Sequence, residues 1–235
     1  MAGQQTLPAT VVLATGNRGK LAEIRALLQG TGREAIAQDE FAVPEVAETG
    51  ASFVENAIIK ARHAARHSGY PALADDSGLE VDCLGGRPGV YSARYAGQGA
   101  GSDGNIERLL AELRSIGHEQ PTARFRCCAV YLRGADDPAP LIADGAWEGW
   151  ILPSRQGSGG FGYDPVFYVP THGCAAAQLD PEIKNAISHR GKAFRYLLQR
   201  MEVRTATDPE YLPPGYSPPG YSPPDYSQIG PGVVL

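Results

Sequence analysis

The 235-residue sequence has no long hydrophobic run and no excess of positive charge. No stretch approaches the roughly 18 apolar residues that a membrane-spanning helix needs. Residues 1–10 lack a basic segment followed by an apolar one, so we expect no secretory signal. A net charge of −5 argues against binding along a nucleic acid. These absences favour a cytoplasmic protein that acts on small molecules, with neither membrane nor nucleic acid as a partner.

Cysteine is also scarce, and its spacing lacks the pairs typical of a metal site. In an enzyme-sized chain without a signal, we expect the cysteines to be buried free thiols in a reducing compartment. They are Cys83, Cys127, Cys128 and Cys174.

The C-terminal segment contains little that could build a core. Residues 213–227 repeat a five-residue Pro-Pro-Gly/Asp-Tyr-Ser pattern three times. Such a segment cannot bury enough apolar surface to become ordered. We therefore expect one domain over residues 1–204 and a disordered tail over 205–235. The tail either binds a partner through its tyrosines or is passive, and a passive tail is the simpler interpretation.

Two adjacent carboxylates, Asp75 and Asp76, stand at the centre of the sequence. Two apolar residues precede them, and Ser77-Gly78 follow, which indicates a strand that ends at a tight turn. Neighbouring side chains on an extended backbone point to opposite sides, so the two should have different roles. One would face a metal or an attacking water and the other would anchor the turn. The alternative is an Asx-type turn that satisfies local backbone donors.

A glycine-containing loop joins a short strand to a helix near the N-terminus. Residues 10–14 are β-branched and apolar, and apolar residues at helical spacing follow over 21–28. Free N–H groups and the positive end of the helix dipole suit phosphate at such a loop, with charge added by Arg18 and Lys20. The spacing is not that of a Walker A motif, and an ordinary helix start is the alternative.

A second helix begins at Ser52, which forms a capping box with Glu55 three residues later. Asn56 and Lys60 share one face of this helix. Lys60 either reaches a site or is an ordinary solvated lysine.

The second half of the chain begins with a predicted long β-hairpin over residues 122–152, where apolar and other residues alternate. The glycine-rich loop 157–165 follows and carries Phe161, Tyr163 and Asp164. An aromatic ring among glycines either stacks on a base or packs into the core.

Basic side chains then gather near a break between two helices. Asp180-Pro181 begins the first of these helices, with an N-cap and a proline at its first position. Lys184, His189 and Arg190 follow within seven residues. They form either a concentrated set of donors or an ordinary basic surface.

Five motifs thus occur in order along the chain. They read Thr15-Gly16-Asn17-x-Gly19-Lys20, Phe53-x-Glu55-Asn56-Ala57-x-x-Lys60-Ala61, Ala74-Asp75-Asp76-Ser77-Gly78-Leu79, Gly160-Phe161-Gly162-Tyr163-Asp164-Pro165 and Lys184-x-Ala186-x-Ser188-His189-Arg190-Gly191. Together they resemble the inosine triphosphate pyrophosphatase family, in its bacterial branch of Ham1-like pyrophosphatases for non-standard purine nucleotides. The resemblance spans roughly residues 10–201 and leaves the repeat tail outside.

The resemblance implies an α/β fold with an elongated mixed sheet, flanking helices and two lobes around a central active-site cleft. It implies hydrolysis of dITP, ITP and XTP to the monophosphate and pyrophosphate. The implied cofactor is Mg²⁺, with Mn²⁺ as a substitute, and the implied assembly is a homodimer.

The resemblance also assigns roles by matching position. Asp76 would be the general base and a metal ligand, with Ser77 beside it. The second metal ligand would be Glu45 or Glu48, of which we favour Glu48. The phosphate site would comprise Thr15, Gly16, Asn17, Arg18, Gly19, Lys20 and Lys60. The base pocket would comprise Phe161, Gly162, Tyr163, Asp164, Lys184, His189 and Arg190.

Selectivity should depend on the edge of the base. Hypoxanthine and xanthine present an acceptor at position 6, where adenine presents a donor, so fixed donors from His189, Arg190 or the backbone would favour the oxo group. Guanine shares that oxo group and must be rejected through its 2-amine.

Two other functions stay open, namely a purine nucleotide sensor that signals through the tail and a Maf-like pyrophosphatase with another nucleotide preference. Asp76, Lys20 and Lys60 favour the enzyme over the sensor, because a pure binder needs no water-activating acid.

Overall fold

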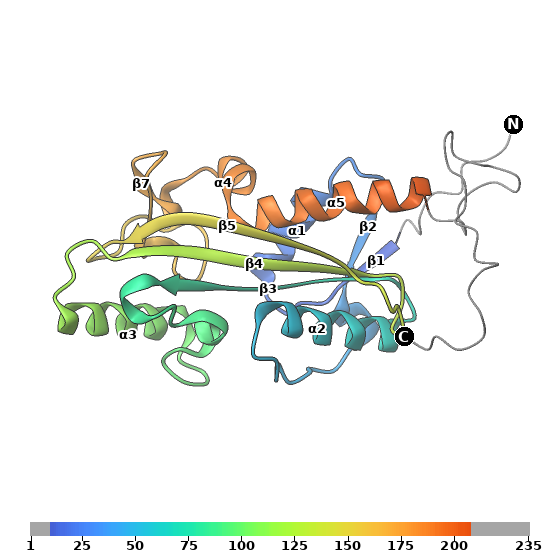
Figure 1. Ribbon diagram of the computed structural model, residues 1–235, viewed down its shortest axis with the longest axis horizontal. Helices are drawn as coiled ribbons and strands as arrows, with labels where there is room; N and C mark the ends of the chain where they lie inside the picture. Colours follow the sequence, from blue (N-terminus) through green and yellow to red (C-terminus); the bar gives the residue numbers. More distant parts are fainter. Residues whose placement is uncertain (1–9, 208–235) are drawn as a thin grey trace, which may run out of the picture.

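The computed structural model describes residues 10–207, which form one seven-stranded mixed sheet with helices on both faces (Figure 1). The strand order is β2-β1-β3-β4-β5-β6-β7. The first three strands are parallel, and every pair from β3 onwards is antiparallel. The strands are β1 (Thr10–Leu13), β2 (Glu34–Ala37), β3 (Ala72–Val81), β4 (Thr122–Leu132), β5 (Leu141–Ile151), β6 (Phe167–Val169) and β7 (Cys174–Ala175).

Five helices flank this sheet within the same described range: α1 (Arg18–Leu28), α2 (Phe53–Ser68), α3 (Gly101–Ile116), α4 (Pro181–Ile187) and α5 (His189–Thr207). The molecule is elongated along the β4–β5 hairpin, with α1 and α5 on the opposite side of the strands from α2 (Figure 1). The expected α/β fold with an elongated mixed sheet is therefore confirmed. The hairpin predicted over residues 122–152 is confirmed as well, as β4 and β5.

Three apolar clusters divide the core. One packs α1 and α5 against one face of β1, β3 and β4, and a second packs α2 against the other face. The α2 cluster is built mainly from alanines, whose small side chains let the helix lie close to the sheet. The third cluster joins α3 to the far half of the hairpin and to β6. The first two clusters form one lobe and the third forms the other.

The start of α5 is fixed to the sheet at a glycine. A Cβ at Gly145 of β5 would overlap the carbonyl oxygen of His189 and lie 2.8 Å from the backbone nitrogen of Ala193. Only a residue without a side chain allows this approach. The first turn of α5, which carries His189 and Arg190, therefore rests directly on the hairpin.

The turn predicted at Asp75-Asp76-Ser77-Gly78 is wrong. These residues lie in the middle of β3, where Asp76 pairs with Cys128 and Gly78 with Arg126 in an antiparallel ladder. A Cβ at Gly78 would overlap the carbonyl oxygen of Gly89 and lie 2.6 Å from Ser92 Oγ. The glycine therefore provides close packing of a distant segment rather than a turn.

The expectation of four buried thiols is half right. All four cysteines are free, and Cys127 and Cys128 are buried, but Cys83 and Cys174 are partly exposed. None of the helices within residues 10–207 is both long enough and apolar enough to cross a membrane. The tail expected over 205–235 lies outside the described residues from 208 onwards, and α5 continues to Thr207.

Candidate active site

A cavity of about 670 Å³ lies between the two lobes. Its volume is in the range of sites for small-molecule ligands. Segments from both lobes line it, including the β1–α1 loop, the loop before α2, the middle of β3 and the α4–α5 junction. The sequence-predicted residues among its lining are Thr15, Gly16, Asn17, Lys20, Glu45, Glu48, Lys60, Asp76, Ser77, Phe161, Gly162, Tyr163, Asp164, Lys184, His189 and Arg190.

The β1–α1 loop is held by two short-range bonds. Thr15 Oγ1 accepts from the backbone nitrogen of Asn17 at 3.1 Å, and Asn17 Oδ1 caps α1 by accepting from the nitrogen of Lys20 at 3.1 Å. A Cβ at Gly16 would meet nothing within 4 Å, so the backbone there is open to a ligand. The loop therefore presents the positive end of α1 to the cavity.

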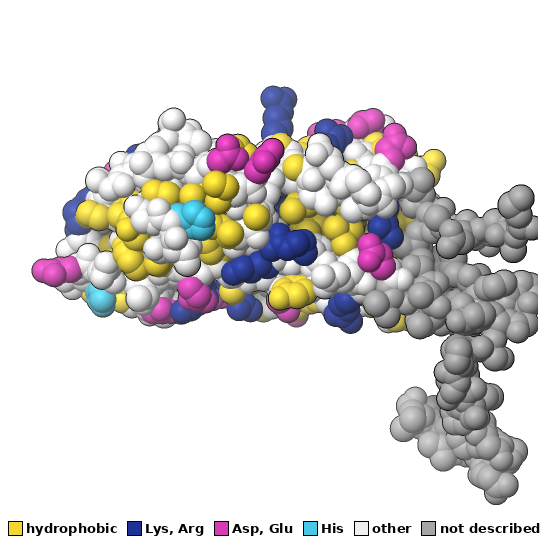
Figure 2. Space-filling model, turned by 90° about the horizontal axis from the view of Figure 1, so that it is seen from above, with side chains coloured by type: hydrophobic (Ala, Val, Ile, Leu, Met, Phe, Trp, Pro, Cys, Tyr) yellow, Lys and Arg dark blue, Asp and Glu magenta, His cyan; other side chains and the backbone are white. Residues whose placement is uncertain are grey.

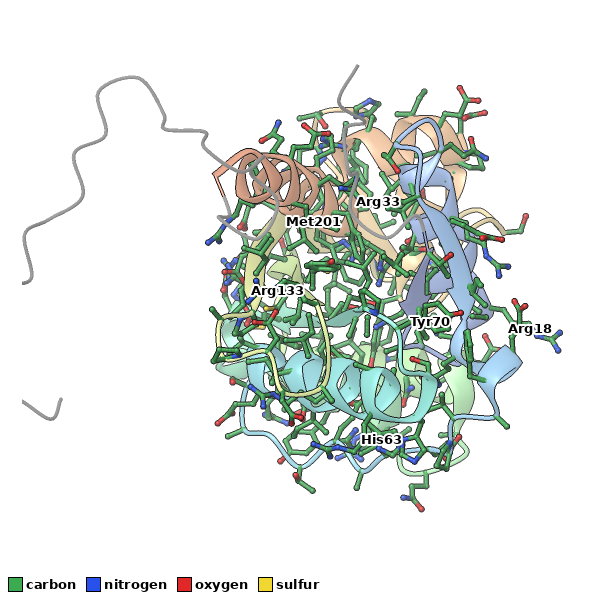
Figure 3. The ribbon with its side chains drawn as sticks, turned by 90° about the vertical axis from the view of Figure 1, so that its right-hand side faces the viewer. Arg18, Arg33, His63, Tyr70, Arg133 and Met201 are labelled. Atoms are coloured by element: carbon green, nitrogen blue, oxygen red, sulfur yellow. The ribbon has the colours of Figure 1, made fainter. Side chains whose placement is uncertain are left out.

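Two residues of this motif are placed differently. Arg18 does not line the cavity, and its side chain points away from the body of the molecule (Figure 3). Gly19 lies under the ring of Phe161, where a Cβ would be 2.6 Å from Phe161 Cδ1. Gly19 therefore allows the ring to pack against the first turn of α1.

Helix α2 holds the loop that precedes it through three side chains spaced one turn apart. Residues 56, 60 and 63 share one face of the helix. The loop runs along that face in the direction opposite to the helix. The contacts are Gly50 N to Asn56 Oδ1 at 2.8 Å, Lys60 Nζ to Glu48 Oε1 at 3.0 Å, and His63 Nε2 with the carbonyl oxygen of Pro44 at 2.8 Å. His63 is labelled beside this loop in Figure 3.

Asp76 receives donors from α2 on both of its oxygens. Lys60 Nζ lies 2.8 Å from Oδ1, and Asn56 Nδ2 lies 3.3 Å from Oδ2. Burial raises the pKa of Asp76 above its usual value, although Lys60 and Lys20 oppose the shift. Burial alone would lower the pKa of Lys60, but Asp76, Asp75 and Glu48 outweigh it and raise that pKa, so the ammonium stays charged. The alternative of a solvated Lys60 is therefore wrong.

The two candidate glutamates differ in their contacts. Glu48 bonds to Lys60 and lies 3.9 Å from Arg94 Nη1, whereas Glu45 is exposed at the edge of the cavity. Asp76 and Glu48 share one ammonium, so their carboxylates face a common point. This geometry favours Glu48 as the companion of Asp76.

A divalent cation fits this pair of carboxylates. Among residues 10–207, no group of three or more His, Cys, Asp or Glu side chains could form a metal cage. Mg²⁺ prefers hard oxygen ligands and is commonly held by one or two carboxylates plus substrate phosphates. The donor set therefore suits a metal that is completed by the substrate and by water.

Asp75 points to the other face of β3, as the alternation of an extended strand predicts. Its Oδ2 lies 3.0 Å from Lys20 Nζ and 3.3 Å from both Nε and Nη2 of Arg190. Burial by itself would raise the pKa of Asp75, but Lys20 and Arg190 outweigh it and hold that pKa well below its usual range. Asp75 is therefore a permanently ionised anchor for two cations of the cavity.

Glu23 was missed by the sequence reasoning. It accepts from Lys184 Nζ at 2.8 Å and from Arg190 Nη1, and Lys184 also bonds to Asp164 Oδ2 at 2.6 Å. Its signal is its position three residues after Lys20, on the same face of α1. A chain of ion pairs thus joins α1 to the glycine-rich loop.

The aromatic residues of loop 157–165 have separate positions. Tyr163 is buried in the core of the second lobe, where its hydroxyl donates to the carbonyl oxygen of Ser92 at 2.9 Å. Phe161 stays partly exposed at the cavity, with Lys184 Nζ 4.9 Å and Arg190 Cζ 5.5 Å from its ring centroid. The core alternative therefore describes Tyr163, whereas Phe161 lies at the wall of the cavity.

His189 also lines the cavity, and one of its ring nitrogens has no hydrogen-bond partner. Its ring stacks on Phe125 with centroids 4.7 Å apart, and its Nδ1 is buried without a hydrogen-bond partner. Burial, with Arg190 and Lys184 adding to it, holds the pKa of His189 well below 6.5, so the ring is neutral. The predicted basic cluster is thus buried, and the alternative of an ordinary basic surface is wrong.

Comparison with known proteins identifies close relatives along nearly the whole described chain. The sequence profile of the Ham1 family matches residues 11–200. A dITP/XTP pyrophosphatase of Methylococcus capsulatus is 58% identical over 195 residues, which cover 83% of this chain and 97% of the relative. The corresponding protein of Thioalkalivibrio sulfidiphilus is 56% identical over 194 residues, covering 83% and 99% of the two chains.

Solved structures agree with the sequence matches. A HAM1 protein from Coxiella burnetii superposes with a TM-score of 0.75 at 50% identity, covering 84% of this chain and 99% of that one. The Ham1 protein of Staphylococcus aureus superposes with a TM-score of 0.72 at 38% identity, covering 83% and 99%.

Removing the charge of Asp75 should destabilise the fold. Asp75→Asn leaves Lys20 and Arg190 without their buried counter-charge, so we expect the free energy of unfolding to fall by about 3–5 kcal/mol. The folded-state pKa lies below the ordinary 3.8, so this stabilisation is present above 3.8 and declines as the pH falls below it. Urea unfolding at about pH 7 and pH 3 measures both effects.

The exposed Asp136→Asn is the control and should leave stability unchanged. An Asp75→Asn loss below about 1 kcal/mol, or one of equal size at both pH values, would contradict this account.

Proposed function

Because the chain belongs to the Ham1 family, we propose that it hydrolyses dITP, ITP and XTP to the nucleoside monophosphate and pyrophosphate. Deaminated purines would thereby be removed from the nucleotide pool. The expected family is confirmed, and with it the assignment as a hydrolase of nucleoside triphosphates. The observation that carries the proposal is a buried aspartate, Asp76, at a cavity lined by cations and by the aromatic and polar side chains of the predicted base pocket.

The phosphate end neutralises charge. Lys20 and Lys60 line the cavity beside the open backbone of the β1–α1 loop, and these groups bind the triphosphate. Asp76, which lines the cavity, accepts the proton of the attacking water. Attack at the α or the β phosphorus yields the same two products.

The metal is Mg²⁺, with Mn²⁺ as a substitute, and Asp76 and Glu48 are the side chains that hold it. When bound, the ion supplies positive charge to the phosphate oxygens and polarises the water. Ser77 Oγ accepts from Arg190 Nη2 at 2.9 Å and so connects the phosphate site to the ion-pair chain.

The base end recognises a 6-oxo purine. Neutral His189 and the guanidinium of Arg190 supply polar groups, while Phe161 offers a ring on which the base stacks. The 6-amine of adenine would leave these fixed groups unpaired, and a buried mismatch of this kind discriminates by orders of magnitude.

Product analysis tests the reaction. Purified protein with Mg²⁺ should release pyrophosphate and monophosphate from dITP and XTP, and little from dGTP or ATP. Asp76→Asn should lower kcat by about 10²–10⁴-fold while nucleotide still binds. Reaction in ¹⁸O-water assigns the attack, because the label enters the monophosphate if the α phosphorus is attacked and pyrophosphate if the β phosphorus is attacked.

Orthophosphate as the product, or equal rates on the four nucleotides, would refute this chemistry. No product at all would favour the nucleotide sensor, and a preference for another nucleotide would favour the Maf-like alternative.

Selectivity should fail before turnover when the base end is changed. His189→Ala should lower the ratio of kcat/KM for XTP over ATP at least tenfold or so, since the site loses a fixed polar partner. Because the pKa of His189 lies well below 6.5, the wild-type ratio should be constant between about pH 6.5 and 8. His172→Ala, an exposed histidine on the β6–β7 loop, is the control; a wild-type ratio in His189→Ala would contradict the role of His189.

We also infer a homodimer that uses the exposed end of the hairpin. Along β5, side chains that point away from α5 alternate with buried ones and include the half-buried Trp150. Trp150 stacks on Tyr168 of β6 with centroids 4.4 Å apart. In Figure 2, which shows the side of the molecule that carries α4 and α5, hydrophobic side chains are exposed near the end that holds β6 and β7 and also elsewhere on this face.

Light scattering tests the dimer. Trp150→Glu should weaken it at least tenfold or so, because it puts a charge in place of the apolar ring proposed to meet the partner. Tyr196→Glu, an exposed aromatic on α5, should leave it unchanged. A monomeric wild type, or a dimer in Trp150→Glu as tight as the wild type, would refute the interface.

A further inference from the structure

Asn56 is a fully buried polar residue that contacts Asp76 from the side of the protein core. It is 0% exposed and is not a lining residue of the cavity, yet its amide bonds directly to Asp76. Its Oδ1 accepts from the backbone nitrogen of Gly50 at 2.8 Å, and its Nδ2 donates to Asp76 Oδ2 at 3.3 Å. One amide therefore spans the loop that carries Glu48 and the strand that carries Asp76.

The orientation of this amide is fixed by its partners. The backbone nitrogen of Gly50 can only donate, so Oδ1 must face it. The Nδ2 group is then directed at Asp76, whose Oδ2 must accept. The reversed amide would leave a buried donor against a donor and an acceptor against a carboxylate, which is costly.

The local sequence forces the loop against Asn56. A Cβ at Gly50 would lie 2.8 Å from Asn56 Oδ1 and 2.5 Å from Glu55 Cβ, so a side chain there is excluded. Two residues later Ser52 begins α2 through its capping box with Glu55, and the backbone nitrogen of Asn56 donates to Ser52 O at 3.2 Å. The start of the helix thus fixes the position of Asn56 relative to Gly50 and Asp76.

Asp76 is consequently held at both oxygens by one helix. Lys60 and Asn56, one turn apart on α2, bind Oδ1 and Oδ2 respectively, which prevents the carboxylate plane from rotating. Lys60 binds Glu48 as well, and Asn56 binds the loop two residues beyond Glu48. The two carboxylates that face the phosphate end are therefore aligned through the same two side chains.

We propose that Asn56 is a positioning residue for the hydrolytic step. It sets the plane of the Asp76 carboxylate and fixes the loop that carries Glu48, without touching substrate or metal itself. This inference rests on the proposed pyrophosphatase function. Partners that orient a metal-binding or reacting side chain typically contribute about 10–100-fold to activity or metal affinity.

Two variants separate positioning from loop anchoring. Asn56→Asp keeps an oxygen for Gly50 N but replaces the donor to Asp76 with a second carboxylate oxygen. Asn56→Leu has a similar volume and removes both bonds. We expect kcat on dITP to fall about 10–100-fold in both variants, with KM changed less than about threefold, because the lost interaction orients the reacting group rather than the nucleotide.

Asp137→Ala controls for lost stability. Asp137 is a buried side chain in the β4–β5 turn that binds main-chain nitrogens of Arg133 and Ala139, outside the cavity. Its removal should lower the melting temperature as the Asn56 variants do, while kcat stays at the wild-type value. A second readout is Mn²⁺ binding followed by electron paramagnetic resonance, which should weaken about 10–100-fold in Asn56→Leu.

The outcomes are distinct. Wild-type kcat in Asn56→Asp would mean that Asn56 only anchors the loop, and it would overturn the inference. Wild-type Mn²⁺ affinity in Asn56→Leu, or an equal loss of kcat in Asp137→Ala, would overturn it as well. If the wild-type protein releases no pyrophosphate from dITP, the proposed function is wrong. The inference about Asn56 is then also wrong only if Asn56→Leu binds Mn²⁺ as tightly as the wild type.

Discussion

The structure depends on one strand that carries two carboxylates to opposite faces of a sheet. Asp76 meets Lys60 and Asn56 on the α2 side, and Asp75 meets Lys20 and Arg190 on the α1–α5 side. Each carboxylate would be costly to bury alone, and each is matched by cations from helices that pack on its own face. The alternation of β3 therefore places one carboxylate at the cavity and leaves the other as an anchor behind it.

The anchor side explains how the lobes are joined. From Asp75 the ion pairs pass through Arg190 and Glu23 to Lys184 and Asp164, and so reach the loop that holds Phe161. All of these groups except the partly exposed Glu23 are buried, so solvent screens them less than it screens surface pairs. The β1–α1 segment and the loop that holds Phe161 are thus linked by one network of ion pairs beside the cavity.

Much of this was predictable where the signal is local. The capping box at Ser52, the N-cap at Asp180 and the hairpin alternation all depend on residues a few positions apart, and the structure confirms each. Five motifs in order identified the family. Most of the site residues predicted from them line one cavity in the structure. The prediction of a turn at Gly78 was wrong because the glycine has a different reason. The backbone of Gly89, from another segment of the chain, packs against it and leaves no room for a side chain.

Glu23 and the bridging role of Asn56 were missed for the same reason, since their partners come from other elements. The aromatic pair of loop 157–165 could not be divided by composition alone. Only the fold shows that Tyr163 reaches Ser92 while Phe161 rests on Gly19.

The bare contact at Gly145 links the hairpin to recognition of the base. Since no side chain separates β5 from the first turn of α5, the distance of His189 from the sheet is set by direct backbone contact. A change in the twist of the hairpin would move the first turn of α5 and, with it, Arg190. Because Arg190 binds Asp75 on β3 and Glu23 on α1, this motion would reach the β1–α1 segment as well. The two ends of the cavity would therefore shift together rather than separately.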